Sequence, residues 1–121
     1  MRFVNAGGVT PDIHPSVAID GIVDCVHKVT IEKDVFSGHS VAILTGGHDP
    51  YKFGEERKES TTGGEVIIHE GVWLGSFCII IGKSEIGKHS VIGAGAVVRG
   101  DVPAYSVVIG NPAMIIKSIP H

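Results

Sequence analysis

Seven histidines are the residues of this 121-residue chain best suited to acid–base chemistry, and His48 has the most unusual setting among them. An imidazole titrates near neutrality and can take a proton from a hydroxyl or an amine. His48 stands in the segment Gly47-His48-Asp49-Pro50, directly before a polar stretch that is rich in charged residues. A single histidine is most often a surface or structural residue, so the residue type alone leaves the role of His48 open.

The elements that must position His48 follow a repeat of six residues. Aliphatic or small residues recur at this spacing on two tracks that are four residues apart, one from Ile13 to Ile43 and the other from Val17 to Val41. After an interruption the tracks continue from Ile68 to Ala104 and from Val72 to Val108. A helix needs apolar residues three and four apart, and a half-buried strand needs strict alternation. A period of six fits neither of them and indicates a repeat architecture.

Each unit of six places one large apolar and one small residue inward, with polar residues or glycine between them, as in Ile86-Gly-Lys-His-Ser-Val91. This pattern predicts a short strand followed by a corner. One unit cannot bury its apolar side alone, so successive units must stack and share one core. The sequence therefore predicts an all-β, parallel β-helix that forms one domain over residues 1–121. Cys25 and Cys78 lie on the inward tracks, and we expect both thiols to be buried and reduced.

The repeat loses phase once, between Ile43 and Ile68, which are 25 residues apart, or four repeats plus one. The segment 49–65 is polar and charged, with Pro50 and Gly63-Gly64 near its ends, and it indicates a loop that leaves a corner of the β-helix. Long loops in compact domains are mostly functional or disordered. The expected division of the chain is coils at about 13–48 and 68–110, an extruded loop at 49–65 and a C-terminal tail at 111–121.

Composition and charge argue against several classes of partner. The net charge is −3, without a basic patch, so nucleic acid and anionic membranes are poor candidates. The longest apolar run, Phe77 to Ile81, is too short to cross a bilayer, and the first residues lack the apolar core of a signal peptide. We expect a cytoplasmic protein.

The two tracks resemble those of the hexapeptide-repeat family over roughly residues 13–110. The resemblance implies a left-handed parallel β-helix with three flat faces, in which three repeats make one triangular coil. Three stretches also resemble the acetyltransferase branch, with its maltose, galactoside and polysaccharide O-acetyltransferases; they are residues 71–76, 92–103 and 105–113. The resemblance therefore implies transfer of an acetyl group from acetyl-CoA to a hydroxyl, or an amine, of a sugar-like or other small acceptor.

In that branch the catalytic histidine stands at the mouth of an extruded loop, so the resemblance implies that His48 is the general base. It further implies direct transfer, with the backbone N–H of Ser76 donating to the oxyanion. The family commonly has a lysine where this chain has Gly100, and Arg99 or Lys117 could contact the CoA phosphates instead. The residues expected along acetyl-CoA are Trp73, Gly75, Gly93, Ala94, Arg99 and Lys117.

Members of the family assemble as homotrimers with active sites at the subunit boundaries, which implies the same for this chain. The extruded loop would then reach a neighbour's groove, and its residues Tyr51, Phe53, Glu55 and Glu56 are candidate acceptor contacts. His39 could line the same cleft. The acceptor itself stays open between a glycan, a nucleotide-sugar amine and an antibiotic.

Two alternatives remain from other classes of protein. One is a hexapeptide-repeat scaffold or binding protein without catalytic activity. The other is a metalloenzyme similar to the γ-carbonic anhydrases, which share the fold and bind zinc through three histidines, two of them in a His-x-x-x-x-His arrangement. That pair is missing from the sequence, so we expect no metal site.

Overall fold

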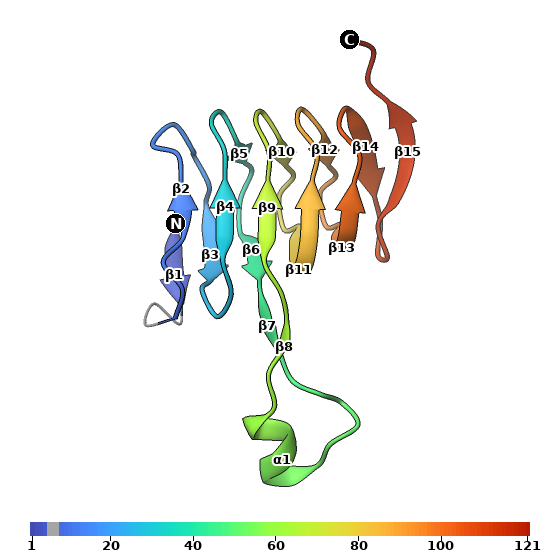
Figure 1. Cartoon of the computed structure of the whole chain (residues 1–121). Helices are drawn as coiled ribbons and strands as arrows, with labels where there is room; N and C mark the ends of the chain where they lie inside the picture. The colour runs from blue at the N-terminus through green and yellow to red at the C-terminus, as the bar shows by residue number, and fades with distance from the viewer. Residues whose placement is uncertain (5–7) are drawn as a thin grey trace.

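The structure, a computed structural model, describes residues 1–4 and 8–121 and shows a stack of short strands arranged along one axis (Figure 1). Successive strands turn through three faces, and strands of neighbouring coils pair in parallel. The chain rises through the near face of Figure 1 and returns behind it while it advances toward the C-terminus, so the coil is left-handed. The predicted all-β, left-handed parallel β-helix is thus confirmed.

The three faces are named here by the strands that form them. Face 1 contains β1 (Arg2–Val4), β3 (Gly21–Asp24), β6 (Val41–Leu44) and the first halves of β11 (Ile79–Ile86) and β13 (Val97–Val102). Face 2 contains β2 (Asp12–Ile13), β4 (Val29–Ile31), β9 (Val66–Ile68) and the second halves of β11 and β13. Face 3 contains β5 (Phe36–Ser37), β10 (Trp73–Leu74), β12 (Val91–Ile92), β14 (Ser106–Ile109) and β15 (Met114–Ser118).

The core lies inside the prism and is formed by the two tracks of the repeat. On face 1, for example, the register aligns Val23, Ile43, Ile80 and Val98 in one inward row, and all four are buried. Burial of one such side chain stabilises the fold by about 1.5–3 kcal/mol, so the row holds the coils together. Ala104 is an exception to the predicted tracks, because it lies exposed at a corner of the last coil, beside the backbone of Gly87.

The C-terminal segment, expected to be a plain tail, forms strand β15 instead. β15 runs antiparallel to β14, unlike the pairs between the coils. The ring of His121 then stacks on Tyr105 at a centroid distance of 3.7 Å, and the N–H of Ile119 donates to the Tyr105 carbonyl at 2.6 Å. These contacts attach the end of the chain to a corner of the prism.

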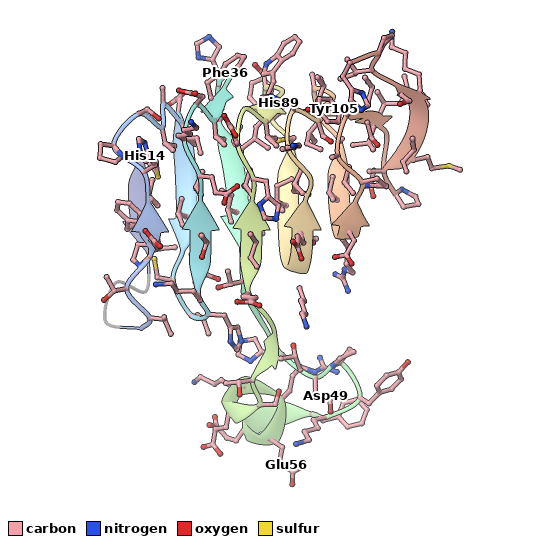
Figure 2. The ribbon with its side chains drawn as sticks, turned by 45° about the horizontal axis from the view of Figure 1, so that its top comes forward. His14, Phe36, Asp49, Glu56, His89 and Tyr105 are labelled. Carbon is pink, nitrogen blue, oxygen red and sulfur yellow. The ribbon has the colours of Figure 1, made fainter. Side chains whose placement is uncertain are left out.

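The loop expected at residues 49–65 is folded, and it leaves the corner between faces 1 and 2. β7 (Gly46–Gly47) and β8 (Thr62–Gly63) form an antiparallel hairpin, and α1 (Gly54–Glu59) lies at its tip. Figure 2 shows Asp49 and Glu56 on this excursion, on the side of the prism opposite to Phe36, His89 and Tyr105.

Candidate active site

The root of the hairpin is fixed by glycine and by contacts to the prism. Gly63 has a φ of 97°, and a side chain there would meet the Thr45 carbonyl oxygen at 2.0 Å, so only glycine fits. On the same strand, β8, the Thr62 carbonyl lies 3.1 Å from Nε2 of His27, at the same corner of the prism. The hairpin therefore leaves the body of the protein in a defined direction.

His48 follows β7 directly, and the end of α1 holds its ring. Its Nδ1 lies 2.7 Å from the carbonyl oxygen of Ser60. A carbonyl can only accept, so Nδ1 carries the hydrogen and Nε2 keeps its lone pair in the neutral ring. Ser60 is the residue after α1, and its hydroxyl accepts the N–H of Asp49 at 2.8 Å. The hairpin thus orients an exposed imidazole whose free nitrogen can act as a base.

A hollow of about 220 Å³ lies beside His48. Its floor includes Asp24, which is buried and binds the loop root, because its carboxylate accepts the N–H of Val26 at 3.2 Å and that of Gly46 at 3.1 Å. Through these hydrogen bonds Asp24 stabilises the base of the hairpin. The other lining residues are Val26, Gly46, Gly47, His48 and Thr61.

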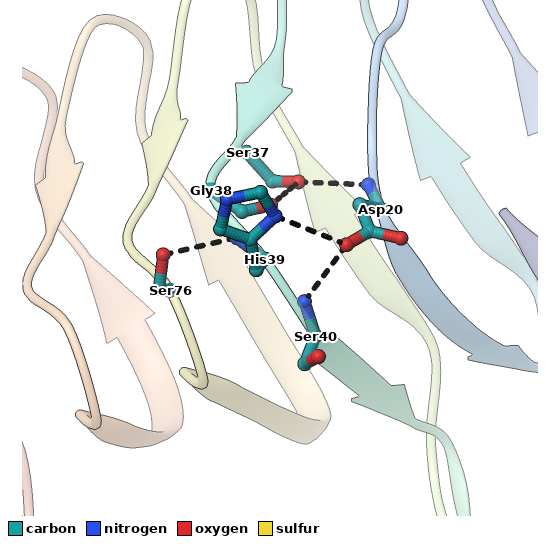
Figure 3. A network of polar contacts seen from close by, with 6 residues as sticks. All are labelled: Asp20, Ser37, Gly38, His39, Ser40 and Ser76. Atoms are coloured by element: carbon teal, nitrogen blue, oxygen red, sulfur yellow. Dashed lines mark hydrogen bonds and ion pairs between the residues drawn. The ribbon is translucent and has the colours of Figure 1, made fainter.

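Ser76 lies at a different corner of the prism, between faces 3 and 1. Its hydroxyl accepts the backbone N–H of His39 at 2.9 Å (Figure 3). Its own backbone N–H donates to no acceptor in residues 1–4 and 8–121, and is therefore free to meet a ligand. Strand β6 separates this corner from His48, so one chain does not bring the two predicted catalytic residues together.

The glycine and alanine positions expected along the acyl donor continue the Ser76 corner. Gly75 is packed so closely on the next coil that a side chain would meet the backbone nitrogen of Ala94 at 2.6 Å. Ala94 and Gly95 are exposed, and nothing lies within 4 Å of the position that a Gly95 side chain would take. A side chain on Gly93 would meet Ile109 at 2.8 Å. The corner therefore offers a bare backbone surface to a narrow ligand.

The remaining expected contacts are dispersed. Trp73 lies on the outside of face 3, where it stacks on Phe36 at 6.1 Å. Arg99 is exposed on β13 and Lys117 on β15, which belong to different faces, so the two candidate phosphate contacts do not form one cluster.

The aromatic residues of the hairpin tip point into solvent. Tyr51 is 89% exposed and Phe53 is 77% exposed, and the Arg57 guanidinium lies over the Phe53 ring at 5.3 Å. Glu55 faces Lys58 at 3.9 Å. Tyr51, Phe53 and Glu55 do not line the hollow beside His48. They could therefore contact an acceptor only at a site that a second protomer helps to form.

Both cysteines are free and buried, as expected. Burial raises the pKa of the Cys78 thiol to about 12, and burial followed by the nearby Asp24 carboxylate raises the pKa of Cys25. Both shifts disfavour a thiolate, the reactive form of cysteine, near neutral pH. In the described part of the chain, no three His, Cys, Asp or Glu side chains are placed to hold a metal ion, and no helix is long and apolar enough to cross a membrane.

Comparison with known proteins agrees with this geometry. Residues 65–100 match the family described as bacterial transferase hexapeptide (six repeats). The six-residue repeat of residues 65–100 is therefore a hexapeptide repeat of this family. Over 88% of its length, this hexapeptide-repeat chain is 39% identical to serine acetyltransferase 2 of Arabidopsis thaliana, of which it covers 32%. It spans about half or less of the length of the curated relatives it matches first.

Two solved structures place the hexapeptide-repeat chain among similar folds. A maltose O-acetyltransferase from Clostridium difficile 630 superimposes with a TM-score of 0.68 at 27% identity, covering 98% of this chain and 71% of that one. A galactoside acetyltransferase in complex with coenzyme A superimposes with a TM-score of 0.61 at 28% identity, covering 88% and 56%. The predicted resemblance to maltose and galactoside acetyltransferases is therefore confirmed.

Sequence reasoning missed the partners that orient the site. Ser60 acts through its backbone carbonyl, and every residue has one, so the residue type cannot predict this contact. Asp24 and His27 carried a weak signal, because they stand at the corner one coil before His48, where a loop root needs support.

Proposed function

We propose that the protein transfers an acetyl group from acetyl-CoA to a small acceptor, with His48 as the general base. The observation that carries this proposal is the His48 ring, whose Nδ1–H donates to the Ser60 carbonyl while Nε2 has no hydrogen-bond partner among the described residues. The relatives named above, acetyltransferases that act on maltose, galactosides and serine by name, support the same reaction. The galactoside enzyme bound to coenzyme A supports the acyl donor.

The site needs two protomers. His48 and Ser76 lie at opposite edges of face 1, but at nearly the same level along the prism, because β6 pairs directly with the first half of β11. Neighbouring coils are only about 5 Å apart. A rotation about an axis parallel to the prism keeps these levels, so a cyclic assembly can bring the His48 of one protomer to the Ser76 of the next.

The outer surfaces of faces 1 and 3 support this assembly because they are apolar. On face 1 the register aligns the outward residues Ile22, Ala42, Ile79 and Val97. On face 3 it aligns the outward residues Phe36, Trp73, Val91 and Val107. Apolar patches of this kind mark interaction surfaces.

The outer surface of face 2 differs from the other two. Its outward row contains Asp12, Thr30, Ile67, Glu85 and Asp101, which suits contact with water. Faces 1 and 3 meet at the Ser76 corner, so burying them places this corner at the subunit boundary. We infer a homotrimer, with an active site at each boundary.

The acyl donor would lie along the Ser76 corner. Its thioester oxygen would accept the free N–H of Ser76, and the pantetheine arm would run over Ala94 and Gly95, where no side chain obstructs it. Arg99 or Lys117 would contact the phosphates as charged donors. Trp73, Gly75 and Gly93 shape the same surface.

In the reaction, Nε2 of His48 takes the proton of the acceptor hydroxyl or amine as its oxygen or nitrogen attacks the thioester carbon. The carbonyl electrons move onto oxygen, where the Ser76 N–H stabilises the charge. Collapse of this intermediate breaks the carbon–sulfur bond, and the imidazolium returns its proton to the departing sulfur, giving free CoA. No acyl-enzyme is needed, which agrees with the raised pKa values of Cys25 and Cys78.

The test combines acetyl-CoA binding with turnover. Acetyl-CoA at 100 times its Kd should stabilise the protein by about 2.7 kcal/mol in a thermal-shift titration. A panel of hydroxyl and amine acceptors should then release CoA, and mass spectrometry should show an acetylated acceptor. If acetyl-CoA does not stabilise the protein and no acceptor releases CoA, the proposal is overturned. A scaffold without activity would then be favoured.

A further inference from the structure

Phe77, the residue directly after Ser76, is a large apolar side chain at the corner where the acyl donor is proposed to bind. Phe77 is 65% exposed, and in residues 1–4 and 8–121 its ring takes part in no aromatic stacking or cation–π contact. A single exposed apolar residue is ordinary on a protein surface. Two further observations, the backbone conformation of Phe77 and its neighbours along the corner, make this residue unusual.

The backbone of Phe77 is in the left-handed region, with a φ of 63°. This conformation is unfavourable for a bulky residue and is usual for glycine. The corner imposes it, because the N–H of Phe77 donates to the His39 carbonyl at 2.8 Å and the N–H of Cys78 to the Gly75 carbonyl at 3.2 Å. The other described residues with a positive φ are glycines or carry a polar side chain, namely Asp34, Ser40, His89 and Tyr105. Strain of this kind is typical of functional sites.

The neighbours of Phe77 along the corner are much smaller. The hydrogen bonds between the coils place Ser40 and Gly95 at the corresponding positions of the coils before and after Phe77. Nothing lies within 4 Å of the position that a Gly95 side chain would take. Toward the N-terminus the corner is polar instead, and Figure 3 shows His39 there, with its Nδ1 3.5 Å from Oδ2 of Asp20. Phe77 therefore stands between a bare stretch and a polar stretch of the same corner.

This position is the one that an acyl group would reach. The free N–H of Ser76 is proposed to hold the thioester oxygen, and the donor arm is proposed to lie on the bare stretch, over Ala94 and Gly95. The Cα atoms of Ser76 and Phe77 are about 3.8 Å apart, so a phenyl ring on Phe77 can lie against the carbon chain of the thioester. An apolar contact of this kind discriminates between substrates that differ by one methylene group by about 10-fold or more.

We propose that Phe77 limits the length of the acyl group that the protein transfers. Its ring packs against the methyl group of the acetyl thioester and fills the space that a propionyl or butyryl chain needs. A longer chain would have to displace the ring or extend toward the polar Asp20 and His39 side chains, and both are unfavourable. Glycine at this position would suit the backbone better but would leave that space open. This inference rests on the proposed transferase reaction.

Steady-state kinetics with acyl donors of different length test the assignment. Phe77→Gly should raise kcat/KM for butyryl-CoA about 10-fold or more, and Phe77→Leu should raise it less, because the space that it opens is smaller. The value for acetyl-CoA should stay within about threefold in both variants. Glycine is compatible with a φ of 63°, so Phe77→Gly should unfold at a temperature close to that of the wild type.

Tyr105→Gly is the matched control. Tyr105 is also an aromatic residue with a positive φ, 59°, but it lies at the corner between faces 2 and 3. Its substitution should leave the ratio of the two kcat/KM values unchanged. An unchanged ratio in Phe77→Gly would overturn the length limit and leave the transferase intact. Dissociation of the Phe77→Gly trimer in analytical ultracentrifugation, with loss of turnover for every donor, would also overturn it, because the ring would then hold subunits together.

Binding of the donors is measured separately by calorimetry. The wild type should bind acetyl-CoA about 10-fold more tightly than butyryl-CoA, and Phe77→Gly should bind the two about equally. This pattern without transfer to any acceptor would support the length limit and count against the transferase. Transfer from acetyl-CoA with equal binding of both donors by the wild type would overturn the length limit alone. Absence of acetyl-CoA binding would overturn both proposals.

Discussion

His48 is held by a single hydrogen bond to a backbone carbonyl, and this has a clear consequence for its substitution. Alanine at position 48 removes the proposed base but leaves the Ser60 carbonyl, the hairpin and the Ser76 corner in place. A general base contributes about 10²–10⁴-fold, so His48→Ala should lower kcat by that factor. Acetyl-CoA affinity, measured by calorimetry, should hardly change.

The control for this substitution is His14→Ala. His14 is exposed on the first coil, where its ring forms hydrogen bonds with Ser16, so its removal should leave turnover unchanged. Full turnover in His48→Ala, with any acceptor that the wild type acetylates, would remove His48 from the reaction.

At the scale of single residues, the sequence predicted the position of the candidate base but not what orients it. The loss of phase after Ile43 placed His48 at the mouth of an excursion, and the structure has it there. The Ser60 carbonyl could not be anticipated, because it depends on where a six-residue helix ends. The sequence named His39 as a possible residue of the cleft but not its contact with Asp20, because the two residues are distant in sequence and only coil stacking makes them neighbours.

Among the elements, the hairpin depends on Gly63. A methyl group at this position would collide with the Thr45 carbonyl, and its φ of 97° is unfavourable for any other residue. Gly63→Ala should therefore open the β7–β8 pair and release the His48 ring. We expect turnover to fall at least about 10-fold, and hydrogen exchange at residues 46–47 to accelerate, while the circular dichroism of the coils is kept.

Gly54→Ala is the matched control for the hairpin. Gly54 also has a positive φ, 56°, but no atom lies within 4 Å of its missing side chain, at the start of α1. Its substitution should strain the tip of the hairpin, where α1 lies, and leave the β7–β8 pair at its root unchanged. Equal losses of turnover in the two variants would contradict a special role for the root.

A second element-scale feature is a ladder of charged side chains across three coils. Nδ1 of His69 lies 2.8 Å from Glu32, and Nε2 lies 2.7 Å from Glu85. The hydrogen bond to Glu85, followed by that to Glu32, raises the pKa of His69 above its ordinary 6.5. The hydrogen bond from His69 lowers the pKa of Glu32 below its ordinary 4.5.

This ladder should make stability depend on pH. The His69 contribution is complete below pH 6.5 and disappears as the pH rises through its raised folded pKa. The Glu32 contribution is complete above pH 4.5 and disappears as the pH falls through its lowered pKa. His69→Gln should therefore lower the free energy of unfolding by about 1 kcal/mol at pH 5.5, a value reduced for the partly exposed partners, and by less at pH 9.

Urea denaturation at the two pH values measures this difference. His14→Gln, at an exposed site, should change neither value. A His69→Gln cost that is the same at pH 5.5 and pH 9 would show that the ladder acts through packing rather than through charge.

The element pattern shows why the sequence predicted the coils and missed part of their surroundings. The inward tracks come from a strict requirement, since each coil must bury its residues against the next, and Val23, Ile43 and Ile80 obey it. The hairpin and β15 are formed by pairs outside the repeat, which the period cannot describe.

For the whole molecule, the decisive property is the contrast between its sides. Ile79 on face 1 and Ile67 on face 2 both point outward and are both partly buried. Ile79→Lys places a charge in the proposed subunit boundary, and should convert a trimer into a monomer in analytical ultracentrifugation and abolish acetyl transfer. Ile67→Lys puts the same charge beside Thr30 and Glu85, and should leave the trimer and its turnover unchanged.

Dissociation of the trimer by both substitutions, or by neither, would contradict this assignment of the sides.

The sequence also contains a signal for the difference between the sides, which the period of six alone does not reveal. On face 1, from β3 to β13, the inward residues aligned with Val23 are preceded by apolar ones, as in Ile22-Val23 and Ile79-Ile80, whereas face 2 has Glu85-Ile86 and Asp101-Val102.

Strand β15 has a consequence for how many molecules can join. A parallel β-helix ends in unpaired backbone groups, which another molecule could use to lengthen the stack into a filament. On face 3, β15 reverses the strand direction, so an incoming copy finds no parallel partner on which to continue. End-to-end growth is therefore blocked on that face, which favours the sideways association proposed for faces 1 and 3.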